Sequence, residues 1–405
     1  MGAVQIQHSR CAGLDVHKKS IAACVITPEH EETRTFGTMT KDILALSDWL
    51  SQHQVTHVAM ESTGVYWKPV WNILEGNFEL VLANAQHIKG LPGHKTDVKD
   101  CEWIADLLRH GLIRPSFVPD KTQRELRELT RYRVSLVQEH TREVNRLQHT
   151  LEGGNIKLAA VATDIMGKSA QAILGELLAG NADTKAMAGL AKGRMRTKIP
   201  QLREALVGRF GPHQRFLVAR QLAHIDYLDE AIAEVTAEIE ERMRPFEDAV
   251  AILDTIPGID RVAAQCILAE IGIDMSRFRT HAHFSSWAKL CPGNNESAGK
   301  RKSSRIGHGN RWLRRLMVQV ARAAARTKDT YFAAQYHRLK ARHGANRAAI
   351  AVAHSILITI YYLLQRRCTY SELGGNYFDE RDREATVRSL TRRLERLGYK
   401  VTEAA

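Results

Sequence analysis

The chain has 405 residues, and its 58 lysines and arginines outnumber its 45 aspartates and glutamates, which gives a net charge of +13. This length suits two or three domains, and ordinary contents of hydrophobic (44%) and charged (25%) residues exclude global disorder and a fibrous repeat. The positive surplus indicates a polyanionic partner, either nucleic acid or an anionic membrane surface.

The cysteines and the apolar runs indicate a cytoplasmic protein without a membrane partner. The six cysteines form no C-x-x-C pair, which disfavours both a zinc ribbon and a disulfide framework. The first ten residues contain no apolar signal stretch. The longest apolar run, residues 348–364, includes His354 and Thr359 and predicts a buried helix.

The N-terminal elements predict a mixed α/β sheet. Residues 12–28 are typical of a two-stranded hairpin, and the pattern then continues as helix, strand, helix and strand over residues 42–53, 55–61, 65–74 and 78–84. Asp15 lies where the first strand ends, and Glu61 is the last residue of a later strand. A further helix is predicted from Val98 to Gly111. This order of elements displays polar groups at strand ends.

Two long amphipathic segments follow. Residues 121–151 have an imperfect heptad pattern, whereas Val218 to Ile239 alternate apolar steps of three and four over three heptads. The two helices could pair as an antiparallel hairpin. Packing of each helix on its own domain and a dimerising coiled coil are equally compatible with the pattern.

The second half of the chain is predicted to be mainly helical. Residues 251–272, AILDTIPGIDRVAAQCILAEIG, are typical of a helix-hairpin-helix, whose turn would offer backbone N–H groups to a phosphate. Beyond Tyr370 the chain is charged, with a short helical pattern that ends near Leu397.

Most of the positive surplus lies in one stretch. Residues 293–347 hold fourteen lysines and arginines against Glu296 and Asp329. This density suits contacts with a phosphate backbone, although a solvated basic helix face is the alternative. Membrane binding needs a strong apolar face, which the alanine-rich residues 311–328 lack. The candidate nucleic-acid contacts are Lys300, Arg301, Lys302, Arg305, Arg311, Arg314 and Arg315.

Four carboxylates form a candidate metal site: Asp15, Glu61, Asp97 and Asp100. Asp97 and Asp100 are three residues apart and would share one face of a helix, so they could approach the two strand-end carboxylates together. Hard oxygen ligands suit Mg²⁺, and two such ions about 4 Å apart can catalyse phosphodiester chemistry. Taken singly, each residue is more often a cap or a surface group; Asp97, for example, could cap its helix.

Several motifs together resemble one family. They are GLDVHK around Asp15, AMESTGVYW around Glu61, KTDVKD around Asp97 and Asp100, and in the second half IPGIDRVAAQCILAEIG and FSSWAKLCPGNNESAGKRKSSRIGHGNRWLRR. This combination is similar to the DEDD transposases of bacterial insertion sequences, whose recombination is guided by a bridge RNA. The resemblance covers about residues 12–115 and 252–365.

The resemblance implies a fold and a division into domains. The expected fold is α/β plus mainly α, with a mixed sheet of the ribonuclease H or RuvC type. The expected parts are a RuvC-like DEDD catalytic domain at 1–120, a helical coiled-coil connector at 121–248, a C-terminal transposase domain at 249–370 and a charged tail at 371–405. Residues 150–215 match no familiar pattern.

The resemblance also implies a nucleophilic serine. The family's serine corresponds to Ser297, in a segment that we expect to be a loop, with Lys300 and Arg301 placed to neutralise a phosphate. Ala298 follows where the family pattern has glycine, and Ser303 or Ser304 could be mistaken for the nucleophile from sequence alone.

Three functions remain open at this stage. The first is an RNA-guided DNA recombinase that uses Mg²⁺, or Mn²⁺, and Ser297, with element ends, target DNA, a guide RNA and further copies of the chain (a dimer or tetramer) as partners. The second is a metal-dependent nuclease or junction resolvase without covalent serine chemistry. The third is a non-enzymatic nucleic-acid binder.

Overall fold

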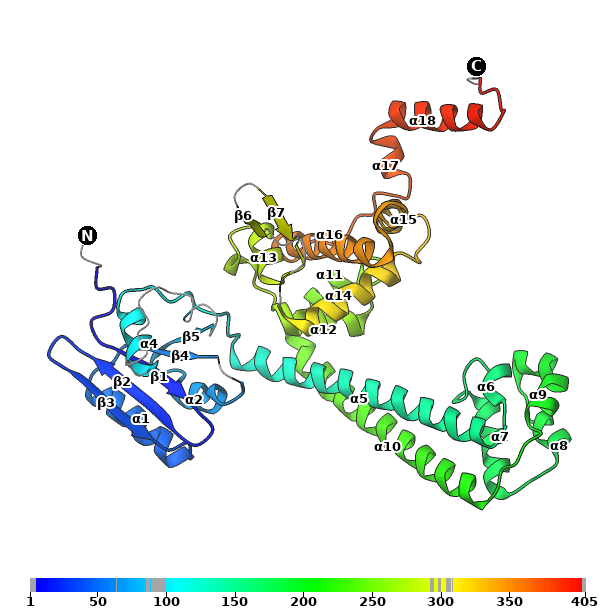
Figure 1. The fold of residues 1–405 in the computed structure, drawn as a ribbon, viewed down its shortest axis with the longest axis horizontal. Helices are drawn as coiled ribbons and strands as arrows, with labels where there is room; N and C mark the ends of the chain where they lie inside the picture. The colour runs from blue at the N-terminus through cyan, green and yellow to red at the C-terminus, as the bar shows by residue number, and fades with distance from the viewer. Residues whose placement is uncertain are drawn as a thin grey trace. The chain divides into compact units, whose positions relative to one another are not determined.

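The computed structural model describes residues 5–62, 64–84, 88, 100–291, 295–297, 300–303, 307 and 309–402, and for 295–297 and 300–303 it describes the backbone alone. The chain divides into two compact units, Met1–Pro119 and Asp120–Ala405, which are taken separately below (Figure 1).

The N-terminal unit is built on a five-stranded mixed sheet in the order β3-β2-β1-β4-β5. The three antiparallel strands β1 to β3 form a meander, and β4 and β5 run parallel to β1. The strands are β1 (Cys11–Val16), β2 (Ile21–Ile26), β3 (Glu31–Phe36), β4 (His57–Glu61) and β5 (Glu79–Ala83). The described helices of this unit are α1 (Thr40–Gln52), α2 (Trp67–Leu74) and α4 (Asp100–Arg109).

The sequence predicted only two strands before α1, and this prediction is wrong because β3 is also present. Its residues, EETRTF, are mostly polar and partly or fully exposed, so no apolar alternation indicates a strand. β3 instead forms by pairing along its whole length with β2, from Phe36 opposite Ile21 to Glu31 opposite Ile26. Exposed polar side chains are common on such edge strands.

The two faces of the sheet pack against different helices. Alternate residues of a strand point to opposite faces. Ala12, Leu14 and Val16 of β1 belong to the core that includes side chains of α1 and α2. Cys11 of the same strand belongs to the core that includes the buried residues of α4. The helix predicted at residues 98–111 corresponds to α4, although residues 98 and 99 lie outside the described part of the chain.

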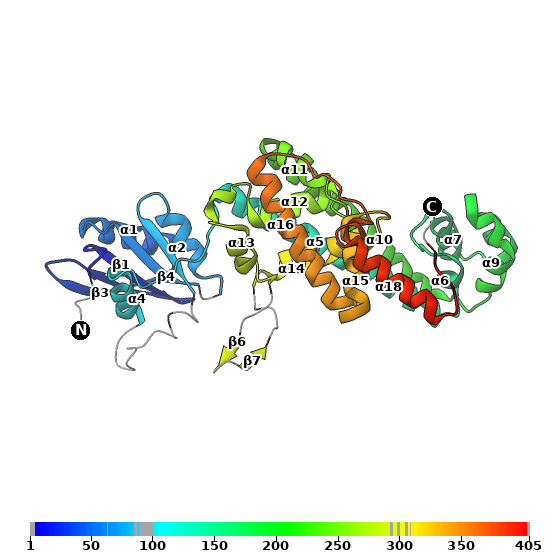
Figure 2. The same cartoon turned by 90° about the horizontal axis from the view of Figure 1, so that it is seen from above.

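The second unit begins with a long antiparallel helix pair, α5 (Lys121–Gly153) and α10 (Pro212–Met243). Figures 1 and 2 both show these helices side by side. Gln221 donates to Thr150 at 3.1 Å near one end, and Arg242 contacts Glu125 at 2.8 Å near the other. The predicted antiparallel hairpin is therefore confirmed. Heptad residues of α10, including Val218 and Ile225, are buried within the chain itself, which favours this pairing over a dimerising coiled coil.

Between α5 and α10 the chain forms a small helical bundle, in the region where residues 150–215 match no familiar sequence pattern. Its core includes Leu158, Ile173 and Leu202, together with Leu147 of α5 and Val218 of α10. Its elements are α6 (Leu158–Val161), α7 (Lys168–Ala179), α8 (Thr184–Gly189), the 3-10 helix η1 (Gly193–Lys198) and α9 (Ile199–Ala205).

After α10 the chain is mainly helical, with one two-stranded ribbon. The elements are η2 (Arg244–Phe246), α11 (Glu247–Asp254), α12 (Arg261–Ile271), η3 (Met275–Arg277), α13 (His281–Trp287), β6 (Asn295–Ser297), β7 (Lys300–Ser303), α14 (Arg311–Ala324), α15 (Tyr331–His343), α16 (Ala345–Arg366), α17 (Tyr377–Glu380) and α18 (Arg383–Arg396). The predicted helix-hairpin-helix corresponds to α11 and α12, and the helical pattern of the tail corresponds to α18.

The predicted buried helix at 348–364 is confirmed as α16. Val352, Ile356 and Ile360 are fully buried in a core that also contains side chains of α12 and α14. By length and composition α16 is the single helix among the described residues that could cross a membrane. Its packing instead makes it the central helix of this part of the fold.

Candidate active site

Two of the predicted carboxylates lie at the ends of neighbouring strands. β1 and β4 are parallel, and Leu14 is paired with Met60. The next residues along these strands are Asp15 and Glu61, so both lie at the carboxyl edge of the sheet. The carboxyl ends of parallel strands commonly display side chains to one site. The side chain of Asp15 is 20% exposed and is therefore accessible to a ligand.

Gly13 determines how closely α4 can approach this edge. A Cβ atom on Gly13 would lie 2.3 Å from the carbonyl oxygen of Cys101 and 2.4 Å from the nitrogen of Ala105, so no side chain fits there. Gly13 and Asp15 are two residues apart and share the sheet face that α4 covers. Asp100, the first residue of α4, is thereby brought to the strand that carries Asp15.

The carboxylates influence one another electrostatically. Burial raises the pKa of Asp15; His17 opposes this rise, and the negative charges of Asp100 and Glu61 add to it. Asp100 and Glu61 are thus near enough to Asp15 for their charges to act on it. The fourth predicted carboxylate, Asp97, lies outside the described residues. The oxygen donors that are gathered fit Mg²⁺, whose charge would relieve their repulsion.

His17 is a neighbour of the site that the sequence analysis did not identify. Its Nε2 atom lies 2.9 Å from Oδ2 of Asp15, and its side chain is 62% exposed. The signal was present in the motif GLDVHK, because residues two apart along an extended chain point to the same side. The imidazole is placed to orient the carboxylate.

The predicted serine does not lie in a loop. Ser297 is the last residue of β6, and its backbone pairs with that of Lys300 in β7. Glu296 pairs with Arg301 in the same antiparallel ribbon. The expectation of a loop is therefore wrong: polar residues form this ribbon by backbone pairing, as in β3. The side chains of Ser297, Lys300, Arg301 and Lys302, and the whole of Arg305, lie outside what the structure describes.

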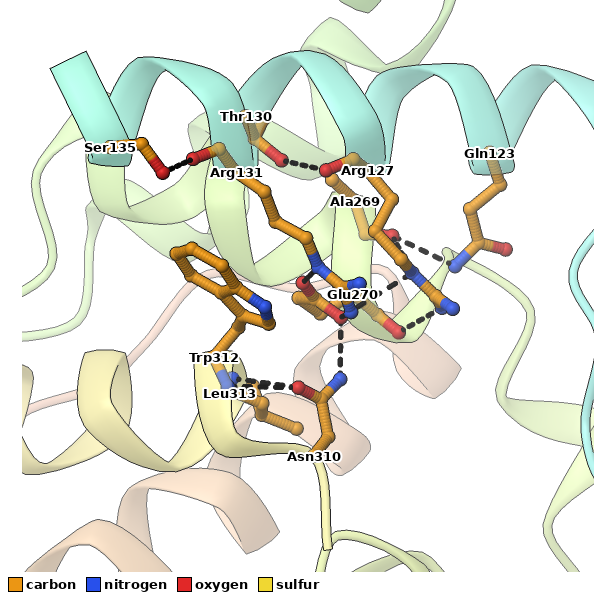
Figure 3. Close-up of polar contacts among 10 residues, drawn as sticks. All are labelled: Gln123, Arg127, Thr130, Arg131, Ser135, Ala269, Glu270, Asn310, Trp312 and Leu313. Carbon is orange, nitrogen blue, oxygen red and sulfur yellow. Dashed lines mark hydrogen bonds and ion pairs between the residues drawn. The ribbon is translucent and has the colours of Figure 1, made fainter. Parts of the chain in front are cut away.

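A buried ionic network fixes the chain just after this ribbon. Figure 3 shows Glu270, the penultimate residue of α12, at its centre. The Glu270 side chain is 3% exposed and accepts hydrogen bonds from Arg131 Nε at 2.7 Å and from Arg131 Nη2 at 2.9 Å. Arg127 Nε lies 3.3 Å from the same carboxylate. A buried carboxylate needs such partners, because an unpaired charge in the interior is strongly destabilising.

The same network reaches the start of α14. Asn310 donates to Glu270 Oε2 at 2.5 Å, and its own Oδ1 caps α14 by accepting from the backbone nitrogens of Trp312 (3.0 Å) and Leu313 (3.2 Å) (Figure 3). Arg127 also donates to the backbone carbonyl of Glu270 at 2.7 Å. Burial lowers the pKa of Arg127, whereas Glu270 acts in the opposite direction. The side chain of Glu270 thus joins α5, α12 and the N-terminal cap of α14.

The predicted basic contacts on α14 differ from one another. Arg311 and Arg315 are exposed, and the guanidinium of Arg311 lies 5.5 Å from the ring centre of Trp312. Arg314 is only half-exposed; its Nη2 donates to the carbonyl of Gly307, and its Nε is buried without a partner among the described residues. Arg311 and Arg315 are therefore available for phosphate contacts, while Arg314 holds the backbone before α14.

At the helix-hairpin-helix turn the protein itself caps the start of α12. The side chain of Asp260 caps α12 by accepting from the nitrogen of Ala263 at 2.7 Å. Gly258, in the turn, packs so closely on α14 that a Cβ atom would lie 2.4 Å from the nitrogen of Ala324. The turn therefore also serves packing, and its contact with a phosphate stays a prediction.

Sheet and carboxylates together define a class. A five-stranded mixed sheet in this order, with acidic residues at the ends of β1 and β4 and at the start of α4, is consistent with a ribonuclease H-like DEDD fold. The family profiles that this sequence matches agree with this assignment of the fold. Residues 12–156 match the DEDD family profile of the IS110 type, described as "Transposase", and residues 250–337 match "Transposase IS116/IS110/IS902 family".

The two profiles together cover more than half of the chain, which belongs to the IS110 family of insertion-sequence transposases. It is 28% identical over 296 residues to the transposase for insertion sequence element IS1111A of Coxiella burnetii (strain RSA 493 / Nine Mile phase I), covering 71% of this chain and 72% of the relative. It is 27% identical over 333 residues to the insertion element IS900 uncharacterized 42 kDa protein of Mycobacterium paratuberculosis, covering 72% and 80%. Membership of a transposase family implies that the chain binds, cuts and rejoins DNA.

Proposed function

We propose that this transposase is an RNA-guided DNA recombinase with a serine nucleophile and an acidic metal site. The observation that carries the proposal is the position of Asp15 and Glu61 at the carboxyl ends of neighbouring parallel strands, with Asp100 near enough for its charge to raise the pKa of Asp15. Asp15, Glu61, Asp97 and Asp100 would hold Mg²⁺, or Mn²⁺, which when bound activates an attacking oxygen and neutralises phosphate charge.

The proposed role of Ser297 is covalent. Its hydroxyl oxygen attacks a DNA phosphorus and forms a phosphoserine bond, while a bond from that phosphorus to a deoxyribose oxygen breaks and leaves a hydroxyl end. A hydroxyl end of another strand then attacks the phosphoserine, which rejoins DNA and restores the serine. Lys300, Arg301, Lys302 and Arg305 would neutralise the phosphate, and Arg311 and Arg315 would bind neighbouring phosphates.

The proposal includes partners and a domain assignment. The partners are the element ends, the target DNA, a guide RNA, and further copies of the chain in a dimer or tetramer. The assigned parts are the catalytic domain at 1–120, the connector at 121–248, the serine-bearing domain at 249–370 and the tail at 371–405. Sequencing the nucleic acid that co-purifies with the protein tests the guide, because an RNA encoded beside the gene is expected.

A trapping experiment tests the covalent chemistry. Nicked DNA from which the released strand diffuses away should leave a protein-DNA adduct on a denaturing gel, and EDTA should abolish it. Free cleaved strands without an adduct would instead support the second candidate, a metal-dependent nuclease or junction resolvase, which the same carboxylate cluster favours. Binding without any cleavage would leave only the nucleic-acid binder.

A further inference from the structure

A second group of potential metal ligands lies on the N-terminal unit, away from the carboxylates. It consists of His30, Glu32 and His53. His30 ends the turn between β2 and β3, Glu32 is in β3, and His53 directly follows α1. One ligand atom from each residue lies within 4.8 Å of those of the other two.

The strand register separates this group from the candidate active site. Asp15 is paired with Ala22 near the start of β2. Glu31, one residue before Glu32, is paired with Ile26 at the opposite end of β2. The two groups therefore lie at opposite ends of the sheet, and the proposed recombination chemistry does not involve the second group.

The donor types and spacing suit zinc. Nε2 of His53 lies 3.4 Å from Oε2 of Glu32. Bonds of about 2.0–2.1 Å in a tetrahedral zinc site place two donor atoms roughly 3.4 Å apart, so this pair already has the separation of two ligands of one ion. We propose that His30, Glu32 and His53 bind Zn²⁺ through two imidazole nitrogens and one carboxylate, with water as the fourth ligand.

The surrounding contacts hold the ligands in place before any ion binds. Nδ1 of His30 lies 3.3 Å from Oγ1 of Thr27, a buried threonine, so the other ring nitrogen is left for a metal. Arg10 donates to the backbone carbonyl of His53 at 3.1 Å and is itself neutralised by Glu29 at 2.8 Å. A ring partner such as Thr27 orients a metal-binding histidine and raises the affinity of a site, while Arg10 fixes the backbone at His53.

The ion would add a further link between two segments of the N-terminal unit. His30 and His53 make a ring contact with centroids 5.0 Å apart, and Glu32 and His53 are paired while remaining 41% and 18% exposed. A bound zinc ion would fasten the β2–β3 turn to the end of α1. Because it binds the folded state, zinc should then raise the melting temperature of this unit.

Metal titration of the full-length protein tests the proposal. Chelator-treated protein is titrated with Zn²⁺ in excess Mg²⁺, and Co²⁺ replaces Zn²⁺ for visible spectroscopy. We expect one saturable zinc ion per chain, cobalt bands typical of tetrahedral coordination, and a higher melting temperature with zinc. Glu32→Gln and His53→Gln should each weaken binding by at least roughly tenfold and remove the cobalt bands.

Two variants serve as matched controls. His57→Gln removes a histidine that stacks on His8, with ring centroids 3.8 Å apart, and Asp15→Asn alters the candidate active site. Both should keep the wild-type zinc affinity. Zinc binding that is unchanged in Glu32→Gln and His53→Gln, or that is lost in Asp15→Asn, would overturn the proposal. Melting without zinc shows whether each variant folds, and His30→Gln provides a third ligand variant should one of the others fail to fold.

Discussion

Asn310 and Glu270 are joined by a hydrogen bond of 2.5 Å that links the cap of α14 to a carboxylate already held by α5. Arg131 occupies both oxygens of that carboxylate. The start of α14 is therefore attached, through Glu270 of α12, to α5 of the long helix pair.

Glu270→Gln should destabilise the second unit strongly. The substitution keeps the shape of the side chain but leaves Arg127 and Arg131 without a negative partner in a largely buried place. Breaking a buried ion pair by removing one partner costs about 3–5 kcal/mol, so the free energy of unfolding should fall by that order. Urea unfolding followed by circular dichroism measures the change.

The control for Glu270 is an ion pair of similar chemistry on the surface. Glu247 accepts two hydrogen bonds from Arg261, yet both side chains are nearly half-exposed. Glu247→Gln should change the free energy of unfolding by no more than about 1 kcal/mol, because exposed ion pairs contribute little. Equal losses in the two variants would show that burial of Glu270 is not the decisive factor.

Gly13→Ala should disturb the candidate active site by displacing α4, which carries Asp100. The new Cβ atom would meet the carbonyl oxygen of Cys101 at 2.3 Å, so α4 must move and take Asp100 with it. Overpacking of this kind costs about 1–3 kcal/mol, and we also expect weaker Mg²⁺ binding, measured by calorimetry. Gly175→Ala is the control: nothing lies within 4 Å of its Cβ position in α7, and the helix should gain about 0.5–1 kcal/mol.

The sequence predicted the elements that have a strong apolar period. The helices α5, α10 and α16 have buried residues that recur at helical spacing, and the strands β1, β2, β4 and β5 are short, mostly apolar runs. β3 and the ribbon of Ser297 were missed because backbone pairing, which leaves no apolar signature in residues such as EETRTF or NES, creates them.

For the site, the sequence predicted residue types but not contacts. Asp15 and Glu61 were found from their positions at strand ends, and Asp100 from its spacing to Asp97; the structure adds the close approach of α4 to Gly13, which brings Asp100 to the strand of Asp15. The Glu270 network joins residues that are 40 and 139 positions apart, and no local pattern contains that information. In the sequence, Arg314 is indistinguishable from Arg311 and Arg315 as a candidate phosphate contact, but in the structure it donates to the backbone carbonyl of Gly307.

Asp15→Asn should abolish recombination and yet stabilise the N-terminal unit in the absence of divalent ions. The pKa of Asp15 is raised in the folded state, so ionisation of this group favours unfolding. The stability that the protonated carboxyl contributes is present below its unfolded pKa and is lost as pH rises through the folded pKa. The Asn variant should therefore melt at a higher temperature at neutral pH, and the difference should vanish under acidic conditions.

The effect of Mg²⁺ on the melting temperature, with a surface carboxylate variant as control, also tests the role of Asp15. Mg²⁺ should raise the melting temperature of the wild type more than that of Asp15→Asn, because the variant lacks one of the proposed ligands. Asp48→Asn, at an exposed position of α1, should change neither recombination nor the magnesium response. Full recombination by Asp15→Asn, or undiminished wild-type activity in EDTA, would remove the metal site from the proposal.

Replacing Arg311 and Arg315 by Ala should weaken binding to unrelated DNA sequences to a similar extent. Each lost phosphate contact should lower the slope of log affinity against log salt by about one. Arg314→Ala should leave the slope nearly unchanged and destabilise the segment before α14, because its guanidinium already bonds to Gly307. Fluorescence anisotropy at several salt concentrations measures these slopes.

Arg261→Ala is the control variant, because Arg261 is already paired with Glu247. An unchanged slope in the Arg311/Arg315 double variant would identify both arginines as solvated surface residues.

Ser297→Ala should abolish the protein-DNA adduct, whereas Ser303→Ala should retain it. The two serines lie in the same ribbon: Ser297 pairs with Lys300, and Ser303 pairs with Asn295. Both replacements remove a hydroxyl from a strand of this ribbon, so any general effect on its folding should be similar. Only the nucleophile is needed to form the covalent bond.

The adduct is measured on a denaturing gel with nicked DNA and Mg²⁺. DNA binding is measured by anisotropy to show that each variant still binds DNA. An adduct that survives in Ser297→Ala and disappears in Ser303→Ala would reassign the nucleophile, and cleavage by Ser297→Ala at the wild-type rate would show that water or another group attacks the phosphate.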